Sequence, residues 1–116
     1  MKEPRELTLM LHACADGTRL RILRLLADGR EISVSDLTLL LHLSQPLVSW
    51  HLRILRRSSL ISMRRTGRQA LYRLNRLEWD GLRASLDHLL VSSMATREAE
   101  PARLLPGLRQ QETVVG

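Results

Sequence analysis

The feature that most constrains this chain is the segment 44–76, which holds eight arginines and no acidic residue. Eight like charges without nearby counter-charges cannot be buried together, because removing each charge from water is costly. The arginines must therefore line a surface, while the apolar residues between them pack inward. Since Arg binds phosphate through a flat, bidentate fork, this segment favours a polyanion as partner, and nucleic acid is the commonest one. A solvated basic face without a partner is the alternative interpretation.

The segments on either side of this one are balanced or acidic. Residues 1–43 carry six basic and six acidic side chains, and residues 77–116 carry four basic and six acidic ones. The formal net charge of +6 is therefore due to the middle segment alone.

The composition of the 116 residues is typical of one small folded domain, with 44 % hydrophobic and 26 % charged residues. Aromatic residues make up only 3 %, so the core must be aliphatic. A single cysteine, Cys14, excludes an internal disulfide and fits the reducing cytoplasm. We expect no signal peptide, because residues 1–6 are too charged, and no apolar run approaches the roughly 18–20 residues that a membrane span needs. We expect a cytoplasmic protein, and a core this small favours an oligomer.

The hydrophobic periodicity predicts a mainly α-helical chain with one small β-hairpin. We expect helices over residues 7–14, 19–27, about 33–41, 44–57 and about 75–93, a short strand over 31–33, and hairpin strands over 60–65 and 69–74. Two short helices joined by a tight turn and followed by an arginine-bearing hairpin describe a winged helix-turn-helix. We place this domain at residues 1–94 and expect a mobile tail at 95–116, where Pro and Gly interrupt the pattern.

Local signals refine two of these helices. Thr18 is expected to be the N-cap of the second helix. The inward stripe of that helix is predicted to include Leu20, and Arg19 is expected on the solvent side. The spacing of Asn75 and Glu78 predicts a capping box at the start of the last helix.

The helix over 44–57 has the pattern of a DNA-reading helix. Val48, Leu52 and Leu55 lie on one side, which must face the core. Gln45 can pair with adenine and Arg53 with guanine, while arginines near a hairpin tip can follow phosphates or enter a narrow minor groove. The predicted DNA-binding residues are Ser44, Gln45, Pro46, Ser49, Trp50, Arg53, Arg57, Arg64, Arg65 and Arg68.

Two residues of this helix need separate consideration. Trp50 lies on the outward face, where it can pack on a thymine methyl or a sugar, cover part of a partner subunit, or simply be a surface residue. His51 lies nearer the core side. We expect it to be a hydrogen-bonded structural residue or a phosphate contact rather than a metal ligand.

Three blocks of the sequence resemble the ArsR/SmtB family of bacterial regulators. They are residues 16–23 (DGTRLRIL), residues 43–55 (LSQPLVSWHLRIL), and Gly67-Arg68 together with residues 71–74 (LYRL). The resemblance implies a homodimeric winged helix-turn-helix that binds double-stranded DNA at an inverted-repeat operator, usually as a repressor until an inducer releases it. It also implies an interface made by the first and last helices, which here carry Leu7, Met10, Leu11, Trp79, Leu82, Leu86 and Leu89.

The chain departs from this family where many members bind metal. Serines, Ser33 and Ser35, stand where the family's thiolate ligands lie, and a neutral hydroxyl is a poor ligand for soft metals. On the last helix His88 matches one ligand of a second family site, but Val91 replaces its partner. We therefore expect no metal and no cofactor.

Two alternatives remain open, and a third is not expected. One is a metal-responsive regulator with a non-standard site near His12, Cys14 and His88. Another is a protein-interaction module with Trp50 as its anchor. An enzyme is disfavoured, because the chain has neither a Gly-rich phosphate loop nor a nucleophile with a matching base.

A further departure concerns the backbone. Ser59 occupies a position where the family usually has Gly. If the position requires a left-handed conformation, Ser costs about 1 kcal/mol relative to Gly there.

Overall fold

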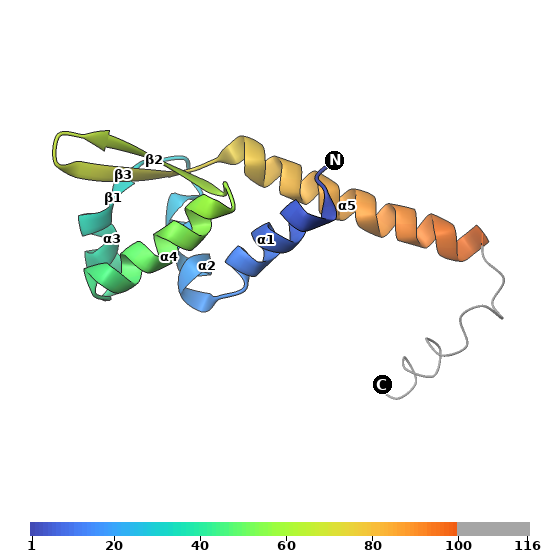
Figure 1. Ribbon diagram of the computed structural model, residues 1–116, viewed down its shortest axis with the longest axis horizontal. Coiled ribbons are helices and arrows are strands. Elements are labelled where there is room, and N and C mark those ends of the chain that lie inside the picture. Colours follow the sequence, from blue (N-terminus) through green and yellow to red (C-terminus); the bar gives the residue numbers. More distant parts are fainter. Residues whose placement is uncertain (100–116) are drawn as a thin grey trace, which may run out of the picture. The chain divides into compact units, whose positions relative to one another are not determined.

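The computed structural model of the chain describes residues 1–99, and the predicted tail lies outside the described residues from 100 onward (Figure 1). The elements are α1 (Pro4–Cys14), α2 (Gly17–Leu26), β1 (Ile32–Ser33), α3 (Val34–Leu41), α4 (Gln45–Arg57), β2 (Ile61–Thr66), β3 (Gln69–Leu74) and α5 (Arg76–Ala99). Their order and type confirm the predicted winged helix-turn-helix. The last helix continues to Ala99, beyond its predicted end near Ser93.

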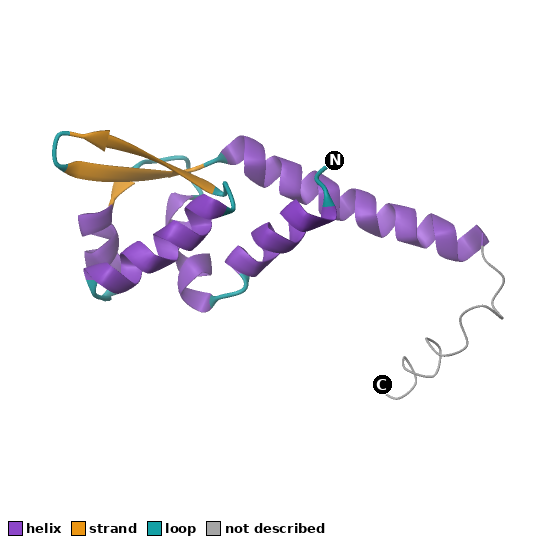
Figure 2. Cartoon of the chain, viewed as in Figure 1, coloured by secondary structure: helices purple, strands orange, loops and turns teal. Residues whose placement is uncertain are grey.

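The chain divides into two compact units, Met1–Ser85 and a second one that begins at Leu86 within α5. The first unit contains the helix-turn-helix of α3 and α4 and a sheet with strand order β1-β3-β2. Both strand pairs are antiparallel, and Met63 lies opposite Tyr72 in the hairpin. Because β1 pairs only with Leu71 and Tyr72, the tip of the β2–β3 hairpin extends beyond it as the wing (Figure 2).

The core of the first unit is aliphatic, as the composition predicts. Its largest fully buried aliphatic side chains come from α2, α3, α4 and the approach to β2, and they are Ile22, Leu26, Leu37, Leu52, Leu55, Leu60 and Val48. The three residues that the periodicity of α4 assigned to the core are all among them. The buried face of α4 is therefore fixed, and so is the face that it turns outward.

The start of α2 differs from the prediction. Asp16, not Thr18, is the N-cap, and its carboxylate accepts a hydrogen bond of 3.1 Å from the backbone N–H of Arg19. The buried stripe then contains Arg19 and Ile22, while Leu20 is 51 % exposed. Arg19 therefore does not face solvent as expected. The prediction placed Leu20 in the buried stripe because an apolar residue is usually buried in preference to a charged neighbour. Here the hydrogen bonds of Arg19 allow the charged residue to be buried instead.

The shorter loops follow simple capping rules. Ser33 caps α3 by accepting a hydrogen bond of 3.1 Å from Asp36 N–H. α4 ends in a Schellman motif, in which the N–H of Leu60 donates to Leu55 O and the N–H of Ser59 donates to Arg56 O. Ser59 has a φ of 66°, so the left-handed conformation considered from the sequence is the one observed.

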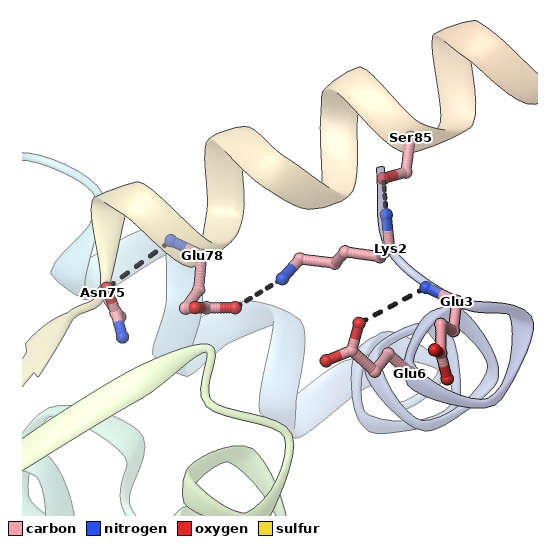
Figure 3. Close-up of polar contacts among 6 residues, drawn as sticks. All are labelled: Lys2, Glu3, Glu6, Asn75, Glu78 and Ser85. Carbon is pink, nitrogen blue, oxygen red and sulfur yellow. Dashed lines mark hydrogen bonds and ion pairs between the residues drawn. The ribbon is translucent and has the colours of Figure 1, made fainter.

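The N-terminal residues are held against the start of α5 (Figure 3). The Lys2 ammonium lies 2.6 Å from a Glu78 carboxylate oxygen, and the Lys2 backbone N–H donates to Ser85 Oγ at 3.0 Å. Asn75 Oδ1 accepts from Glu78 N–H at 3.5 Å, so half of the predicted capping box is present. The other half is missing because the Glu78 side chain binds Lys2 instead. A complete capping box lies at the start of α1, between Glu3 and Glu6.

Candidate nucleic-acid interface

The outward face of α4 carries polar and basic residues at both ends, and Leu47 and Trp50 are exposed between them. Gln45 and Pro46 are exposed in its first turn, and Arg53 and Arg57 are exposed in its second half. Ser44 precedes the helix as N-cap but makes no side-chain capping hydrogen bond. The N–H groups of the first turn are therefore not occupied by that hydroxyl, and a helix N-terminus of this kind favours an anion.

Arg64, Arg65 and Arg68 were all predicted to bind DNA from the hairpin tip, but the structure gives Arg64 a different environment from the other two. Adjacent residues of a strand point to opposite faces, so Arg64 and Arg65 diverge. Arg64 forms a bidentate ion pair with Glu31, with Nε–Oε2 and Nη2–Oε1 distances of 2.6 and 3.0 Å. This hydrogen bonding holds the pKa of the Glu31 carboxyl below its usual value. Arg64 thus ties the wing to the residue before β1, a role that the sequence did not reveal because Glu31 is 33 residues away.

The other two wing arginines are free to bind a partner. Arg65 and Arg68 are exposed and make no hydrogen bond or ion pair with any residue that the structure describes. The same holds for Arg53 and Arg57 on α4, and for Arg56, which is not among the predicted DNA contacts. We call the four of these that are predicted DNA contacts, Arg53, Arg57, Arg65 and Arg68, the unpaired arginine set.

A buried polar network lies beneath α4 and links it to α1. Arg19 donates from Nε to Ala13 O at 2.7 Å, and its Nη1 lies 3.2 Å from His51 Nδ1. Because a guanidinium can only donate, Nδ1 of His51 must be the acceptor, so the imidazole is neutral with its proton on Nε2. The structure confirms that His51 is a hydrogen-bonded structural residue.

The electrostatics of His51 agree with this tautomer. Burial lowers the pKa of the imidazole below its ordinary value of 6.5, and the Arg19 charge lowers it further. The Asp16 carboxylate, 3.7 Å from Nδ1, acts in the opposite direction without reversing the shift. A neutral imidazole is therefore the resting state of His51 at neutral pH.

Trp50 packs against this network as well as facing outward. Its ring meets His51 edge-on, with centroids 4.9 Å apart, and the Arg19 guanidinium carbon lies 6.0 Å from the ring centroid. The side chain is still 49 % exposed. Trp50 thus has a packing role within the chain, which the outward position of this residue on α4 did not predict.

The predicted interface residues fall into three groups. Met10 and Leu82 are buried in the core of the first unit, so a single chain already uses them. Leu7, Trp79 and Leu86 are half-buried. Leu11 and Leu89 are 43 % and 56 % exposed and are available to a second chain. Assignment of these residues to an interface remains a prediction.

The structure also bears on the candidate metal ligands. Among the described residues, no three His, Cys, Asp or Glu side chains are grouped so as to hold a metal ion. Ser33 is buried and engaged as a helix cap. Burial raises the pKa of the Cys14 thiol, so this sulfur is protonated near neutral pH and is a weak ligand. Across residues 1–99, no helix combines the length and the apolar character needed to cross a bilayer.

Comparison with known proteins identifies similar chains. Residues 16–62 match the model of the bacterial regulatory protein family named arsR, a range that runs from the N-cap of α2 into β2. The arsenical resistance operon repressor of Escherichia coli is 46 % identical over 61 residues, which are 53 % of this chain and 52 % of that protein. The chain therefore spans about half the length of that relative.

Two further matches extend over more of the fold. The arsenical resistance operon repressor of Staphylococcus xylosus is 35 % identical over 83 residues, or 72 % of this chain and 79 % of that protein. An ArsR-like transcriptional regulator from a Rhodococcus species has a solved structure with a TM-score of 0.74 and 27 % identity. The match covers 82 % of this chain and 89 % of that one. The proteins that match are named as transcriptional regulators, not as enzymes.

Proposed function

Because the chain belongs to the ArsR family of bacterial regulatory proteins, we propose that it is a sequence-specific DNA-binding transcriptional regulator that acts in the cytoplasm as a homodimeric repressor. The observation that carries the proposal is the unpaired arginine set, whose four members lie on α4 and the wing within a segment that has no acidic residue. Four exposed cations that form no ion pair among the described residues favour binding to a polyanion.

The two elements have different roles in this proposal. α4 enters the major groove with its N-terminal end first, so Gln45 and Arg53 contact base edges. Arg65 and Arg68 of the wing contact the sugar-phosphate backbone, which fixes position but does not read sequence. Arg64 orients the wing through Glu31 and does not contact DNA itself.

The homodimer brings two copies of α4 to one duplex. Leu11 of α1 and Leu89 of α5 are exposed apolar residues that a second chain can cover. Two reading helices related by a twofold axis favour an inverted-repeat operator with half-sites about one helical turn, roughly 10 base pairs, apart.

The test is selection of bound duplexes from a random-sequence library by the full chain. The proposal predicts enrichment of an inverted repeat with the spacing given above. It also predicts that a Gln45→Ala, Arg53→Ala double variant loses this enrichment while it still binds DNA. An unenriched pool with the wild-type chain would contradict the proposal.

We further propose that the regulator works without the metal ligands found in many family members. The support is that Ser33 is occupied as a helix cap and that the Cys14 thiol is protonated. Metal-free protein should bind the selected duplex, and zinc, nickel, cobalt or cadmium should each change the affinity by less than about tenfold, a coupling of about 1.4 kcal/mol. A larger effect of one metal would contradict this and direct mutagenesis to His12, Cys14 and His88.

A further inference from the structure

A groove lies between α2, the end of β3 and the first turn of α5, and its lining includes no residue of α4 or of the hairpin tip. Its volume is about 280 Å³. The lining is mainly apolar and includes Leu20, Leu23, Leu74 and Trp79. Leu20 is 51 % exposed although it belongs to a helix whose neighbouring residues form the core. The groove is thus an apolar surface that this unit of the chain leaves uncovered.

Two arginines border this apolar surface. Arg24 makes no side-chain hydrogen bond or ion pair within the described part of the chain, and Arg76 makes one long bond of 3.4 Å from Nη2 to Ala27 O. No carboxylate belongs to the lining. An apolar floor with two cations and no counter-charge is complementary to a ligand that is itself apolar with an anionic end.

We propose that this groove binds a small amphipathic anion, with a short aliphatic or aryl body against Leu23 and Trp79 and a carboxylate between Arg24 and Arg76. The volume lies just below the usual range of roughly 300–1,000 Å³ for ligand pockets, so the ligand must be small. The carboxylate gains charge-assisted hydrogen bonds from the two guanidinium groups. This proposal concerns ligand binding only and does not depend on the proposed binding of DNA.

Trp79 provides a direct optical probe of the groove. The chain has two tryptophans, so a Trp50→Phe variant leaves Trp79 as the sole indole fluorophore. We expect octanoate to produce a saturable change in Trp79 emission at millimolar concentration or below. Octan-1-ol and octylamine have the same body without the negative charge. They should bind at least about tenfold more weakly, because each lacks the charge-assisted bonds.

Substitutions around the groove test its residues. Arg24→Gln together with Arg76→Gln should weaken octanoate binding at least about tenfold. Arg21→Gln is the matched control, because Arg21 is an exposed residue of the same helix that does not line the groove. It should leave the affinity unchanged within about twofold. Ala27→Leu places a larger side chain into the groove and should abolish binding without loss of the folded state, which circular dichroism verifies.

Three results would overturn the proposal. Equal affinity for octanoate and octan-1-ol would show that the arginines do not recognise an anion. Equal loss of binding in Arg21→Gln would show a general charge effect. A change of the sedimentation coefficient in Ala27→Leu, with no octanoate binding by the wild-type chain, would show that a second copy of the chain covers the groove instead.

Discussion

The guanidinium of Arg19 joins three helices. It lies at the start of α2, donates to the carbonyl groups of Ala13 and His12 at the end of α1, and contacts His51 of α4. The bond to Ala13 O satisfies a carbonyl that the end of α1 would otherwise leave unpaired, whereas His12 O also accepts from the backbone N–H of Ala15. α1 carries predicted interface residues and α4 carries predicted DNA contacts, so Arg19 fixes one functional helix relative to the other.

Replacement of Arg19 should therefore cost more stability than replacement of an exposed arginine. We predict that Arg19→Met lowers the free energy of unfolding by about 2–3 kcal/mol, because buried acceptors on Ala13 and His51 lose their donor. Arg21→Met on the same helix should change it by less than about 0.5 kcal/mol. Urea denaturation measures both variants. Equal effects would show that the Arg19 network does not stabilise the fold.

His51 gives the fold a pH dependence. In the unfolded chain the imidazole takes up a proton near pH 6.5, but burial keeps it neutral in the folded chain to a lower pH. Below pH 6.5 the unfolded state therefore binds more protons, and the free energy of unfolding must fall until the lowered folded-state pKa is passed. The contribution of neutral His51 to the free energy of unfolding is therefore fully present above pH 6.5.

The matched variant for this prediction is His51→Asn, whose amide oxygen can replace Nδ1 as an acceptor but does not titrate. We expect urea denaturation at a series of pH values to give a steeper loss of stability for the wild type than for His51→Asn below pH 6.5. Parallel curves for the two proteins would contradict the assignment of a neutral, buried imidazole.

Ser59 is strained by its position in the Schellman motif after α4. With a φ of 66° it has a backbone conformation that Gly adopts without penalty. Ser59→Gly should raise the free energy of unfolding by about 1 kcal/mol. The same change at Ser62, an exposed residue of β2 with extended backbone, should lower it. Stabilisation by both changes would mean that the gain does not come from the left-handed conformation.

At the scale of elements, α4 could be predicted almost completely from the sequence. Its N-cap, the Pro in its first turn and its buried stripe agree with the structure, because these signals are local and lie within one helix. The partners of Arg19 and Arg64 could not be predicted. His51 is 32 residues from Arg19, and Glu31 is 33 residues from Arg64, so only the folded chain brings them together.

The different positions of α4 and the wing lead to different expected effects on DNA binding. We predict that Arg53→Ala lowers the preference for the selected duplex over a random one by about 1–3 kcal/mol, since a bidentate contact with a base is lost. Arg68→Ala should weaken binding to both duplexes about equally. Fluorescence anisotropy with both duplexes measures these affinities. An exchange of the two patterns would mean that the wing reads the sequence.

At the scale of the whole molecule, the excess positive charge is concentrated in the segment 44–76. The formal net charge is +6, and the segment 44–76 carries more positive charge than that total because residues 77–116 are net acidic. Within this segment Arg64 forms an ion pair with Glu31. The unpaired arginine set forms no ion pair with any described residue. Repulsion among these positive charges destabilises the isolated chain, and binding of a polyanion reduces that repulsion.

The most direct test of DNA binding through this face is the salt dependence of the dissociation constant for the selected duplex. The logarithm of the affinity should fall linearly with the logarithm of salt concentration, with a slope near −0.9 for each neutralised phosphate. Arg68→Ala should reduce the magnitude of that slope by about 1, whereas Arg64→Ala, which removes an arginine already paired with Glu31, should leave it unchanged. A wild-type slope near zero, or equal changes in the two variants, would contradict the account.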